Sequence, residues 1–311
     1  MIRGFFFFKM DCQQILETIR QRLEKESSTP ELDGQILLGQ ILKKPKEWIL
    51  AHPGKTLTLA QEKKFLTLAN RRQKGEPLAY LVGEKEFFSL PFKVNKNTLI
   101  PRPETELLVE KALEIINHTP EKKIILDIGT GSGCIIVSLA HKLKKEKNIR
   151  FLANDLSRPA LALARQNSRL NRMENLIDFF ADDLLGDKTV KKILELSQKE
   201  DFSEIILTAN LPYISEKEYL ELPKSVRAFE PQSALLSGKD GLDHYRKLLA
   251  QLKDFETYFP KKKISLLTEF GWKQKPKMEK IIKKNFPGQK TIFLKDLAGR
   301  WRAVYFSIGV L

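Results

Sequence analysis

The segment Asn210-Leu-Pro-Tyr213 contains the residue types with the most specific chemistry in this sequence. The side-chain oxygen of Asn210 and the main-chain carbonyl of Leu211 can each accept one hydrogen from a planar NH2 group. Pro212 restricts the turn, and the Tyr213 ring can lie against a flat group. These types in this order predict a catalytic pocket that orients an amide or amino nitrogen. A plain turn after a strand is the alternative.

A glycine-rich loop, Asp127-Ile-Gly-Thr-Gly-Ser-Gly133, follows an apolar run. Three glycines at alternate positions allow the backbone to approach a ligand closely and to adopt positive φ. The spacing is GxGxG and lacks the last glycine of a dinucleotide site, so a pyrophosphate cradle is disfavoured. A cofactor without phosphates but with a charged amino-acid end suits this loop, and S-adenosylmethionine is such a cofactor. A tight turn without a ligand is the alternative.

Two further acidic positions lie where the next strands are expected to end. Asp155 can accept hydrogen bonds from both ribose hydroxyls of a nucleoside, whereas Ser157 is the better helix cap. Asp183 is expected near the adenine edge with Leu184 beside the ring, and Asp182 competes for that role. The predicted cofactor-binding set is Asp127, Gly129, Thr130, Gly131, Ser132, Gly133, Asp155, Asp183, Leu184 and Asn210. The predicted catalytic set is Asn210, Leu211, Pro212 and Tyr213, and no metal site is predicted.

The elements that must position these residues alternate between strand and helix patterns after residue 122. Short apolar runs predict buried strands, and longer periodic segments predict helices. The alternation argues for an α/β, doubly wound sheet with an antiparallel C-terminal hairpin. The expected strands are 124–126, 151–153, 177–180, 205–208, 264–268, 291–294 and 303–308. The expected helices are 134–144, 159–170, 242–252 and 278–284.

The first part of the chain has a different pattern. Residues 11–72 read as helices broken at prolines, which predicts a small helical domain. Residues 86–99 read as two strands of a hairpin around Leu90-Pro91, followed by a helix at 104–117 with Leu107, Leu108, Ala112 and Ile115 inward. The segment Pro101-Arg-Pro-Glu-Thr-Glu106 fits a rigid turn with an acidic first helical turn and equally the mouth of a pocket. The predicted domains are 1–82, a linker at 83–103, and 104–311.

Composition limits the class of protein. The 311 residues suffice for two domains, and 42% hydrophobic content allows a large core. The net charge of +15 is spread over lysines at 142–147, 261–263 and 273–283, and solvated faces explain it better than a nucleic-acid surface. Cys12 and Cys134 make neither a disulfide framework nor a zinc site, and they fit a reducing cytoplasm. No apolar run approaches about 18 residues, so no transmembrane segment is expected, and residues before Met10 are expected to be an extension.

Several strings together resemble the release factor glutamine methyltransferases, the PrmC or HemK family. They are Gly75-Glu-Pro-Leu-Ala-Tyr-Leu-Val-Gly-Glu-Lys-Glu-Phe, Ile100-Pro-Arg-Pro-Glu-Thr-Glu106, the glycine loop, Asn210-Leu-Pro-Tyr-Ile214 and Glu230-Pro-Gln-Ser-Ala-Leu. The resemblance implies a class I methyltransferase sheet, S-adenosylmethionine as cofactor, and methylation of the glutamine side-chain nitrogen in the Gly-Gly-Gln loop of class I peptide release factors. It also implies that the helical domain helps to dock this protein substrate.

One position departs from that family, because its turn is Asn-Pro-Pro-Tyr and this chain has Leu211. The acceptor there is a main-chain carbonyl, which leucine also supplies. The Asn-Leu-Pro-Tyr form resembles rRNA adenine dimethyltransferases, so an RNA adenine N6-methyltransferase is the alternative, and a cofactor-binding scaffold without turnover is a third. We expect a cytoplasmic monomer without a membrane partner, and RNA binding is not favoured.

Overall fold

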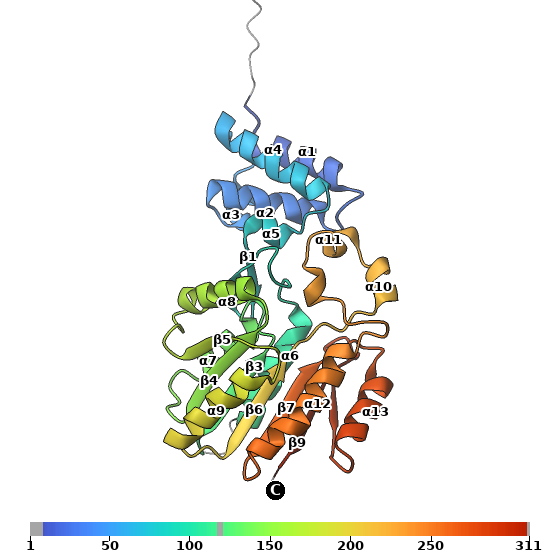
Figure 1. The fold of residues 1–311 in the computed structure, drawn as a ribbon. Coiled ribbons are helices and arrows are strands. Elements are labelled where there is room, and N and C mark those ends of the chain that lie inside the picture. The colour runs from blue at the N-terminus through green and yellow to red at the C-terminus, as the bar shows by residue number, and fades with distance from the viewer. Residues whose placement is uncertain (1–8, 117–120, 310–311) are drawn as a thin grey trace, which may run out of the picture. The chain divides into compact units, whose positions relative to one another are not determined.

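The computed structural model describes residues 9–116 and 121–309, and Figure 1 shows its fold. Contacts within the chain divide it into two compact units. The helical unit comprises the described residues up to Glu84 together with Pro223–Phe229. The sheet unit comprises Lys85–Leu222 and the described residues from Glu230 onward. Each unit has a hydrophobic core of its own, so each is described by itself.

The helical unit packs its helices around Ile15, Ile19, Leu37 and Phe65, which are almost fully buried. Asp11 and Thr58 cap their helices through capping boxes, which satisfies backbone N–H groups that would otherwise lack partners. The helical pattern of 11–72 is therefore confirmed. The helices are α1 (Cys12–Leu23), α2 (Pro30–Leu42), α3 (Lys46–Ala51), α4 (Leu59–Gln73), α5 (Leu78–Val82) and α11 (Lys224–Arg227).

The sheet unit is built on a seven-stranded sheet of order β5-β4-β3-β6-β7-β9-β8. The strands from β5 to β7 are parallel, whereas β9 runs antiparallel to both β7 and β8. This confirms the doubly wound α/β sheet with an antiparallel ending. The strands are β3 (Lys123–Ile128), β4 (Ile149–Asp155), β5 (Ile177–Ala181), β6 (Glu204–Ala209), β7 (Lys263–Glu269), β8 (Ile292–Lys295) and β9 (Trp301–Ile308).

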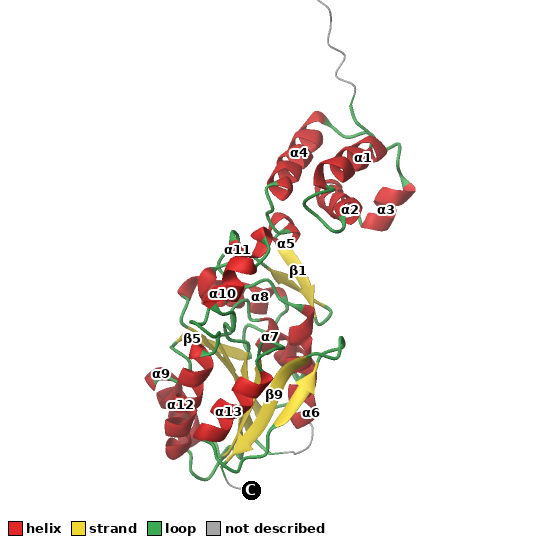
Figure 2. Ribbon diagram, turned by 90° about the vertical axis from the view of Figure 1, so that its right-hand side faces the viewer, coloured by secondary structure: helices red, strands yellow, loops and turns green. Residues whose placement is uncertain are grey.

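Helices cover both faces of this sheet, as Figure 2 shows for α12 and α13 on one side and α6 on the other. Successive side chains of a strand point to opposite faces. Accordingly, Ile124 and Leu126 belong to the core under α9, α12 and α13, whereas Ile125 belongs to the core under α6, α7 and α8. The helices are α6 (Glu106–Ile116), α7 (Cys134–Lys142), α8 (Arg158–Leu170), α9 (Asp187–Lys199), α12 (Asp243–Tyr258) and α13 (Lys275–Asn285).

The hairpin after the helical unit turns earlier than the sequence predicted. Its strands are β1 (Glu84–Phe87) and β2 (Leu90–Lys93), so the expectation of strands on either side of Leu90-Pro91 was wrong. The turn consists of Phe88 and Ser89, both at positive φ, the geometry of a tight hairpin that normally signals itself by Asn-Gly. The Phe88 N–H donates to the Glu106 carboxylate at 2.8 Å, so a tertiary contact holds the turn in place.

Two further helices differ from expectation. A 3-10 turn, η1 (Pro103–Thr105), precedes α6, whose buried side chains are Leu108, Val109, Ala112 and Ile116. The predicted inward Leu107 and Ile115 are only partly buried, and residue 117 lies outside the described residues. Helix α9 was not predicted at all, because its side facing the sheet fully buries only Thr189 and Ile193. In 9–116 and 121–309, no helix is long and apolar enough to cross a membrane.

Candidate active site

The predicted site residues meet at the carboxyl edge of the parallel strands. Strand β3 pairs with β4 on one side and β6 on the other, so the chain order reverses between β3 and β6. Ligands of open α/β sheets bind in the crevice at such a switch point. The glycine loop follows β3, Asp155 ends β4, and Asn210 follows β6, so the fold brings all three to this crevice.

The glycine loop has the backbone conformation that its composition predicted. Gly129, Gly131 and Gly133 have φ of 65°, 57° and 80°, a region that other residues rarely adopt. A Cβ atom on Gly133 would lie 3.1 Å from Ala164 Cβ in α8. Close packing against this helix therefore explains why a glycine is needed at position 133. A Cβ on Gly131 would meet no atom closer than 4.0 Å. Gly131 therefore faces open space, where a ligand can approach the backbone.

Asp127 lies at the base of this loop and is fully buried. Its two carboxylate oxygens accept hydrogen bonds from Thr130 Oγ1 at 2.6 Å and Thr208 Oγ1 at 2.8 Å. Burial raises the pKa of Asp127 to about 7, and the nearby Asp155 carboxylate adds to this rise. Near neutral pH, a cation bound beside Asp127 would therefore favour the ionised carboxylate.

Asp155 contacts the glycine loop directly. Its carboxylate accepts from the Gly131 N–H at 2.9 Å and from the Ser157 N–H at 2.8 Å. Ser157 caps α8, as the sequence indicated, so Asp155 is not needed as the helix cap. Each carboxylate oxygen can accept more than one hydrogen bond. Asp155 thus keeps acceptor capacity for a pair of hydroxyl groups above the loop.

The structure separates the two candidates Asp182 and Asp183. The Asp182 carboxylate accepts from the Thr189 N–H and Oγ1, both at 2.7 Å, and from the Asp183 N–H at 2.9 Å. Asp182 is therefore occupied in holding its own loop. The half-exposed Asp183 carboxylate pairs with Lys247 at 2.5 Å. Leu184, at a φ of 58°, is buried beside it. Asp183 is the one of the two acids that remains accessible to a ligand.

A hydrogen-bond chain fixes the orientation of the Asn210 side chain. Asn210 Nδ2 donates to Thr105 Oγ1 at 3.0 Å, and Thr105 Oγ1 donates to Glu269 Oε2 at 2.7 Å. Because the one Thr105 hydroxyl proton goes to Glu269, its oxygen accepts from the NH2 side of Asn210. The carbonyl side, Oδ1, is thereby left to accept a hydrogen bond from a ligand.

Tyr213 belongs to the same network through Glu269. Its hydroxyl donates to Glu269 Oε1 at 3.0 Å, so both oxygens of this fully buried carboxylate have donors. Burial raises the pKa of Glu269, whereas the two hydroxyl donors and the positive charge of Arg302 oppose the rise. Burial also raises the pKa of Tyr213, and the Glu269 charge adds to this effect. Tyr213 therefore acts as a neutral donor with a fixed ring position.

Leu211 fills the space behind the glycine loop. Its side chain is buried, and a Cβ added to Gly129 would come within 2.9 Å of Leu211 Cδ2. Its carbonyl oxygen lies 3.1 Å from the Tyr245 hydroxyl, which is closer, at 2.5 Å, to the carbonyl of Glu269. The Leu211 carbonyl is thus held in place and retains acceptor capacity. Leucine supplies the main-chain acceptor without the ring of proline.

Sequence reasoning missed Thr105, Glu269 and Tyr245 as members of the site. Thr105 lies in the segment 101–106, which the sequence assigns equally to a rigid turn and to the mouth of a pocket, and its hydroxyl belongs to the candidate site. Glu269 directly follows the strand predicted at 264–268, and an acid at the end of a buried strand is the sequence signal that points to it. A second acid, Glu230, binds the Ile100 N–H at 3.0 Å and Arg102 at 2.5 Å, which anchors the segment that carries Thr105.

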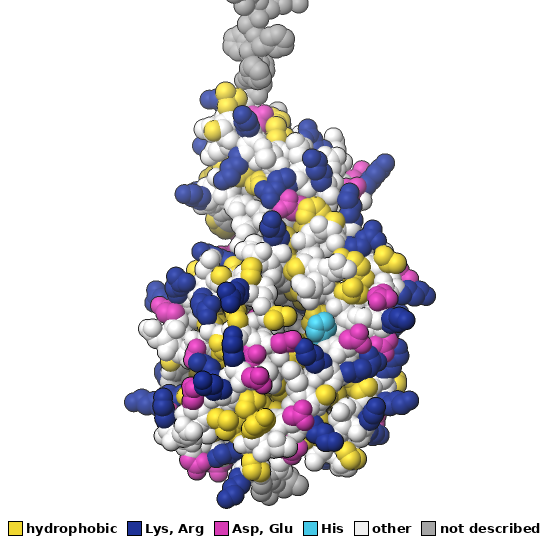
Figure 3. Space-filling model, viewed as in Figure 1, with side chains coloured by type: hydrophobic (Ala, Val, Ile, Leu, Met, Phe, Trp, Pro, Cys, Tyr) yellow, Lys and Arg dark blue, Asp and Glu magenta, His cyan; other side chains and the backbone are white. Residues whose placement is uncertain are grey.

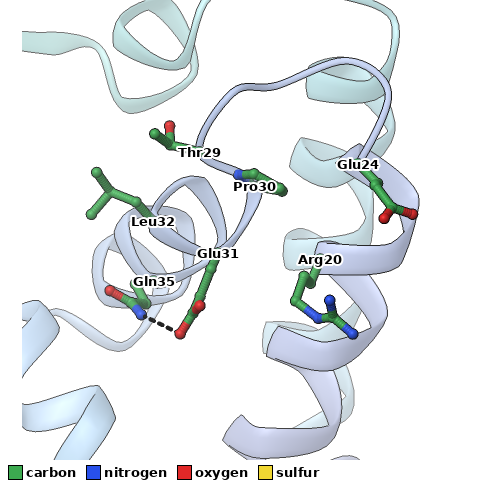
Figure 4. A pocket seen from close by; sticks show the side chains of 7 residues that line it. All are labelled: Arg20, Glu24, Thr29, Pro30, Glu31, Leu32 and Gln35. Carbon is green, nitrogen blue, oxygen red and sulfur yellow. Dashed lines mark hydrogen bonds between the residues drawn. The ribbon is translucent and has the colours of Figure 1, made fainter.

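The helical unit contains a surface hollow of about 520 Å³, shown in Figure 4. Its polar side chains contact one another or their neighbours: Arg20 pairs with Glu17 at 2.8 Å, and Gln35 donates to Glu31 at 3.2 Å. Its lining has neither a glycine loop nor a pair of buried acids. The hollow therefore lacks the chemistry that a nucleoside cofactor requires, which gathers in the sheet unit. It is lined by Arg20, Glu24, Thr29, Pro30, Glu31, Leu32 and Gln35.

Comparisons with known proteins identify the family to which this chain belongs. Residues 14–83 match the PrmC N-terminal domain, and residues 103–195 match the methyltransferase small domain. A release factor glutamine methyltransferase of Nitratidesulfovibrio vulgaris (strain Hildenborough) is 38% identical over 299 residues, which cover 94% of each chain. One of Bacillus anthracis is 31% identical, covering 91% of this chain and 95% of its own. The chain belongs to the release factor glutamine methyltransferase family.

This membership confirms the resemblance seen in the sequence, and the cofactor of this methyltransferase family is S-adenosylmethionine. The relatives do not favour the alternative of an RNA adenine methyltransferase. Among solved structures, the catalytic domain of hMettl16 in complex with the MAT2A 3'UTR hairpin 6 has a TM-score of 0.50 at 17% identity. It covers 79% of this chain and 81% of its own. That likeness shows the fold alone.

Proposed function

We propose that this chain transfers a methyl group from S-adenosylmethionine to the side-chain amide nitrogen, N5, of the glutamine in the Gly-Gly-Gln loop of class I peptide chain release factors. The observation that carries the proposal is the orientation of Asn210 by Thr105 and Glu269. That arrangement presents a fixed acceptor to an NH2 group. Relatives named for release factor glutamine methylation match nearly the whole chain, which supports a glutamine amide as the target.

The charge of the crevice fits the cofactor. Asp127, Asp155 and Glu269 are three acids at one edge of the sheet, and burial raises the pKa of each. Buried acids of this kind are stabilised in their ionised form by a bound cation. S-adenosylmethionine has an ammonium group, a sulfonium and a carboxylate, so it is a net cation. We assign the amino-acid end to the glycine loop with Asp127, the ribose to Asp155, and the adenine edge to Asp183 and Leu184.

The role of the catalytic turn is to orient the amide. Asn210 Oδ1 accepts one N–H of the substrate amide and the Leu211 carbonyl accepts the other, so the nitrogen is held with its face toward the methyl donor. Pro212 restricts the turn, and the ring of Tyr213 packs on the flat amide. Bound S-adenosylmethionine supplies a methyl group on a positively charged sulfur. With the cofactor bound, the turn would hold the amide nitrogen toward this methyl group, and the proton released on N-methylation would pass to water.

The proposal also covers the roles of the domains, the cellular location and the oligomeric state. We assign residues 1–82 to docking of the release factor, 83–103 to a linker, and 104–311 to catalysis. Because release factors act on ribosomes, we place the protein in the cytoplasm. We propose that it acts as a monomer, since one chain holds both the cofactor-binding and the amide-orienting residues. Light scattering of the purified chain tests this last point, and a stable dimer would contradict it.

The test is methyl transfer from tritiated S-adenosylmethionine. The purified chain is incubated with a bacterial class I release factor, with the same factor bearing a replacement of the glutamine in its Gly-Gly-Gln loop, or with naked rRNA. We expect label in the unaltered factor and none in the variant or the rRNA. Equal label in the variant would exclude the glutamine as the target. Label in rRNA alone would instead support the RNA adenine N6-methyltransferase.

A further inference from the structure

A cluster of aromatic rings and cations lies beside the candidate active site in the sheet unit. We call it the cation–aromatic patch, and it combines the loop between β7 and α13 with the β8–β9 hairpin. Lys275 Nζ lies 3.8 Å from the centre of the Trp301 ring, and Lys295 Nζ lies 4.8 Å from it. Its members are Trp272, Lys273, Lys275, Phe293, Lys295, Arg300 and Trp301.

The patch is continuous with the catalytic turn. Strands β6 and β7 are parallel and β9 is antiparallel to β7, so Asn210, Trp272 and Trp301 all lie at one edge of the sheet. Gln274, between Trp272 and Lys275 in the turn before α13, donates to the Tyr213 carbonyl at 2.9 Å. A macromolecule with its reactive group at Asn210 therefore has to pass close to the patch.

Burial and charge within the hairpin also connect the patch to the site. Asp296, at the hairpin turn, pairs with Arg302 at 3.2 Å. Arg302 is buried, and its positive charge opposes the rise that burial causes in the pKa of Glu269 and of Tyr213. This ion pair fixes the hairpin turn relative to the amide-orienting network, so the cations of the patch have a defined position beside the substrate amide.

Among the described residues, the cations of the patch form no ion pairs, although the hydrogen bond from Lys283 and, to a lesser degree, the charge of Lys275 lower the pKa of Glu279 one turn further along α13. Within residues 9–116 and 121–309, no ion pair joins Lys273, Lys275 or Lys295 to a carboxylate, and the same holds for Arg300. By contrast, Lys262 and Lys263, at the opposite edge of β7, are paired with Asp201 and Glu204. Four unpaired cations held on aromatic rings form a positive surface that is complementary to carboxylates.

The rings themselves argue for an acidic protein rather than for RNA. Single-stranded nucleic acid binds by stacking bases on free aromatic faces. Here Lys273 and Arg300 lie 4.9 Å and 5.3 Å from the centre of the Trp272 ring, and the Trp301 ring likewise carries two cations. Contacts with the rings restrict the long side chains, so less conformational entropy is lost when the ammonium groups meet a partner.

We infer that the cation–aromatic patch binds an acidic surface of the protein substrate next to its glutamine loop. This inference rests on the proposed function, because it takes a release factor as the substrate. It concerns affinity for the protein and not the chemistry at Asn210. The patch should therefore affect the KM for the release factor and leave binding of the cofactor unchanged.

The test is a charge reversal with a matched control. The double variant Lys275→Glu, Lys295→Glu is compared with Lys261→Glu, Lys290→Glu, which makes the same change in net charge at exposed lysines on the opposite edge of the sheet. We expect the patch variant to raise the KM for the release factor at least about tenfold, to keep kcat, and to lose most of the salt dependence of KM. The control should resemble the unaltered chain.

Cofactor affinity and melting temperature check that both variants fold. If the double charge reversal unfolds the protein, the double variant Lys275→Gln, Lys295→Gln is used in its place. An unchanged KM in a folded patch variant would overturn the inference while the proposed function stands. A variant that keeps its KM but loses affinity for naked rRNA would also overturn it, because the surface would then serve a nucleic acid. If the unaltered chain labels no release factor, both proposals fall.

Discussion

Thr105 Oγ1 lies 2.7 Å from Glu269 Oε2, although 164 positions separate the two residues in the chain. Thr105 ends the short turn before α6, and Glu269 ends β7. The direction of this one hydrogen bond decides which end of the Asn210 amide faces the substrate. An ionised carboxylate can only accept, so Thr105 has to donate to it and to accept from Asn210.

Replacing Glu269 therefore tests the orientation of Asn210. We expect Glu269→Gln to lower kcat by about 10–100-fold, since a small misplacement of a positioned group costs about that much, while cofactor binding persists. Thr105→Val should have a similar effect and Thr105→Ser should retain activity. Steady-state kinetics and calorimetric titration with S-adenosylmethionine measure both quantities.

The pH profile separates this positioning role from a structural one. Burial raises the pKa of Glu269, so activity of the unaltered chain should fall as acid protonates this carboxylate. Glu269→Gln should lack that limb of the profile. An identical acidic limb in both proteins would contradict the assignment.

Asn210→Ala removes the side-chain acceptor. We expect kcat to fall by about 10²–10³-fold, the usual loss for one oriented polar group at a reacting centre, with the affinity for S-adenosylmethionine largely preserved. Single-turnover methylation of the release factor provides the rate, and equilibrium binding provides the affinity. Full activity of this variant would remove Asn210 from the catalytic set.

Asp127 should make both stability and cofactor binding depend on pH. Its pKa is raised from 3.8 to about 7 in the folded chain, so the folded state holds this proton more tightly than the unfolded state. The stabilisation is therefore complete below about pH 4 and is lost as the pH rises toward 7. The melting temperature of the free protein should fall over that range relative to Asp127→Asn.

Binding of the cationic cofactor should show the opposite trend, because ionised Asp127 attracts the ammonium group. We expect the affinity of the unaltered chain for S-adenosylmethionine to increase as the pH rises through about 7. Asp127→Asn should bind more weakly and with little dependence on pH. A variant with the affinity and pH dependence of the unaltered chain would show that Asp127 does not contact the cofactor.

Leu211 should matter for stability more than for chemistry. Leu211→Ala removes a buried side chain that packs on Gly129, which costs about 2–4 kcal/mol of unfolding free energy. The main-chain carbonyl remains, so kcat at saturating cofactor should change little. Chemical denaturation and kinetics together measure this. A large loss of kcat with unchanged stability would mean that the side chain itself acts on the substrate.

Figure 3 shows where the side chains behind the net charge of +15 lie on one face of the protein. The sequence predicts that most of these lysines are solvated. Lys and Arg side chains are spread over the visible face and alternate with acidic ones. The cation–aromatic patch is a local exception, because its lysines are held on rings. Composition alone could not distinguish these two kinds of lysine, since the difference lies in their neighbours in space.

The glycine loop, the Asn-Leu-Pro-Tyr turn and the alternation of strands and helices were all readable in the sequence. They depend on residues that are adjacent in the chain, where backbone preference and hydrophobic period act locally. The α/β class, the antiparallel ending and the family follow from them. The Ser157 cap was likewise predicted, because a cap bonds to a backbone group only a few residues away.

The tertiary structure alone decided which groups serve those motifs. Thr105, Glu269 and Tyr245 join Asn210 and Leu211 only when distant strands align at one sheet edge, and no local pattern encodes such contacts. The hairpin turn at 88–89 depends on Glu106, and the choice between Asp182 and Asp183 depends on Thr189. Local residue order therefore determined which functional groups are available, and packing across the sheet determined how those groups are oriented.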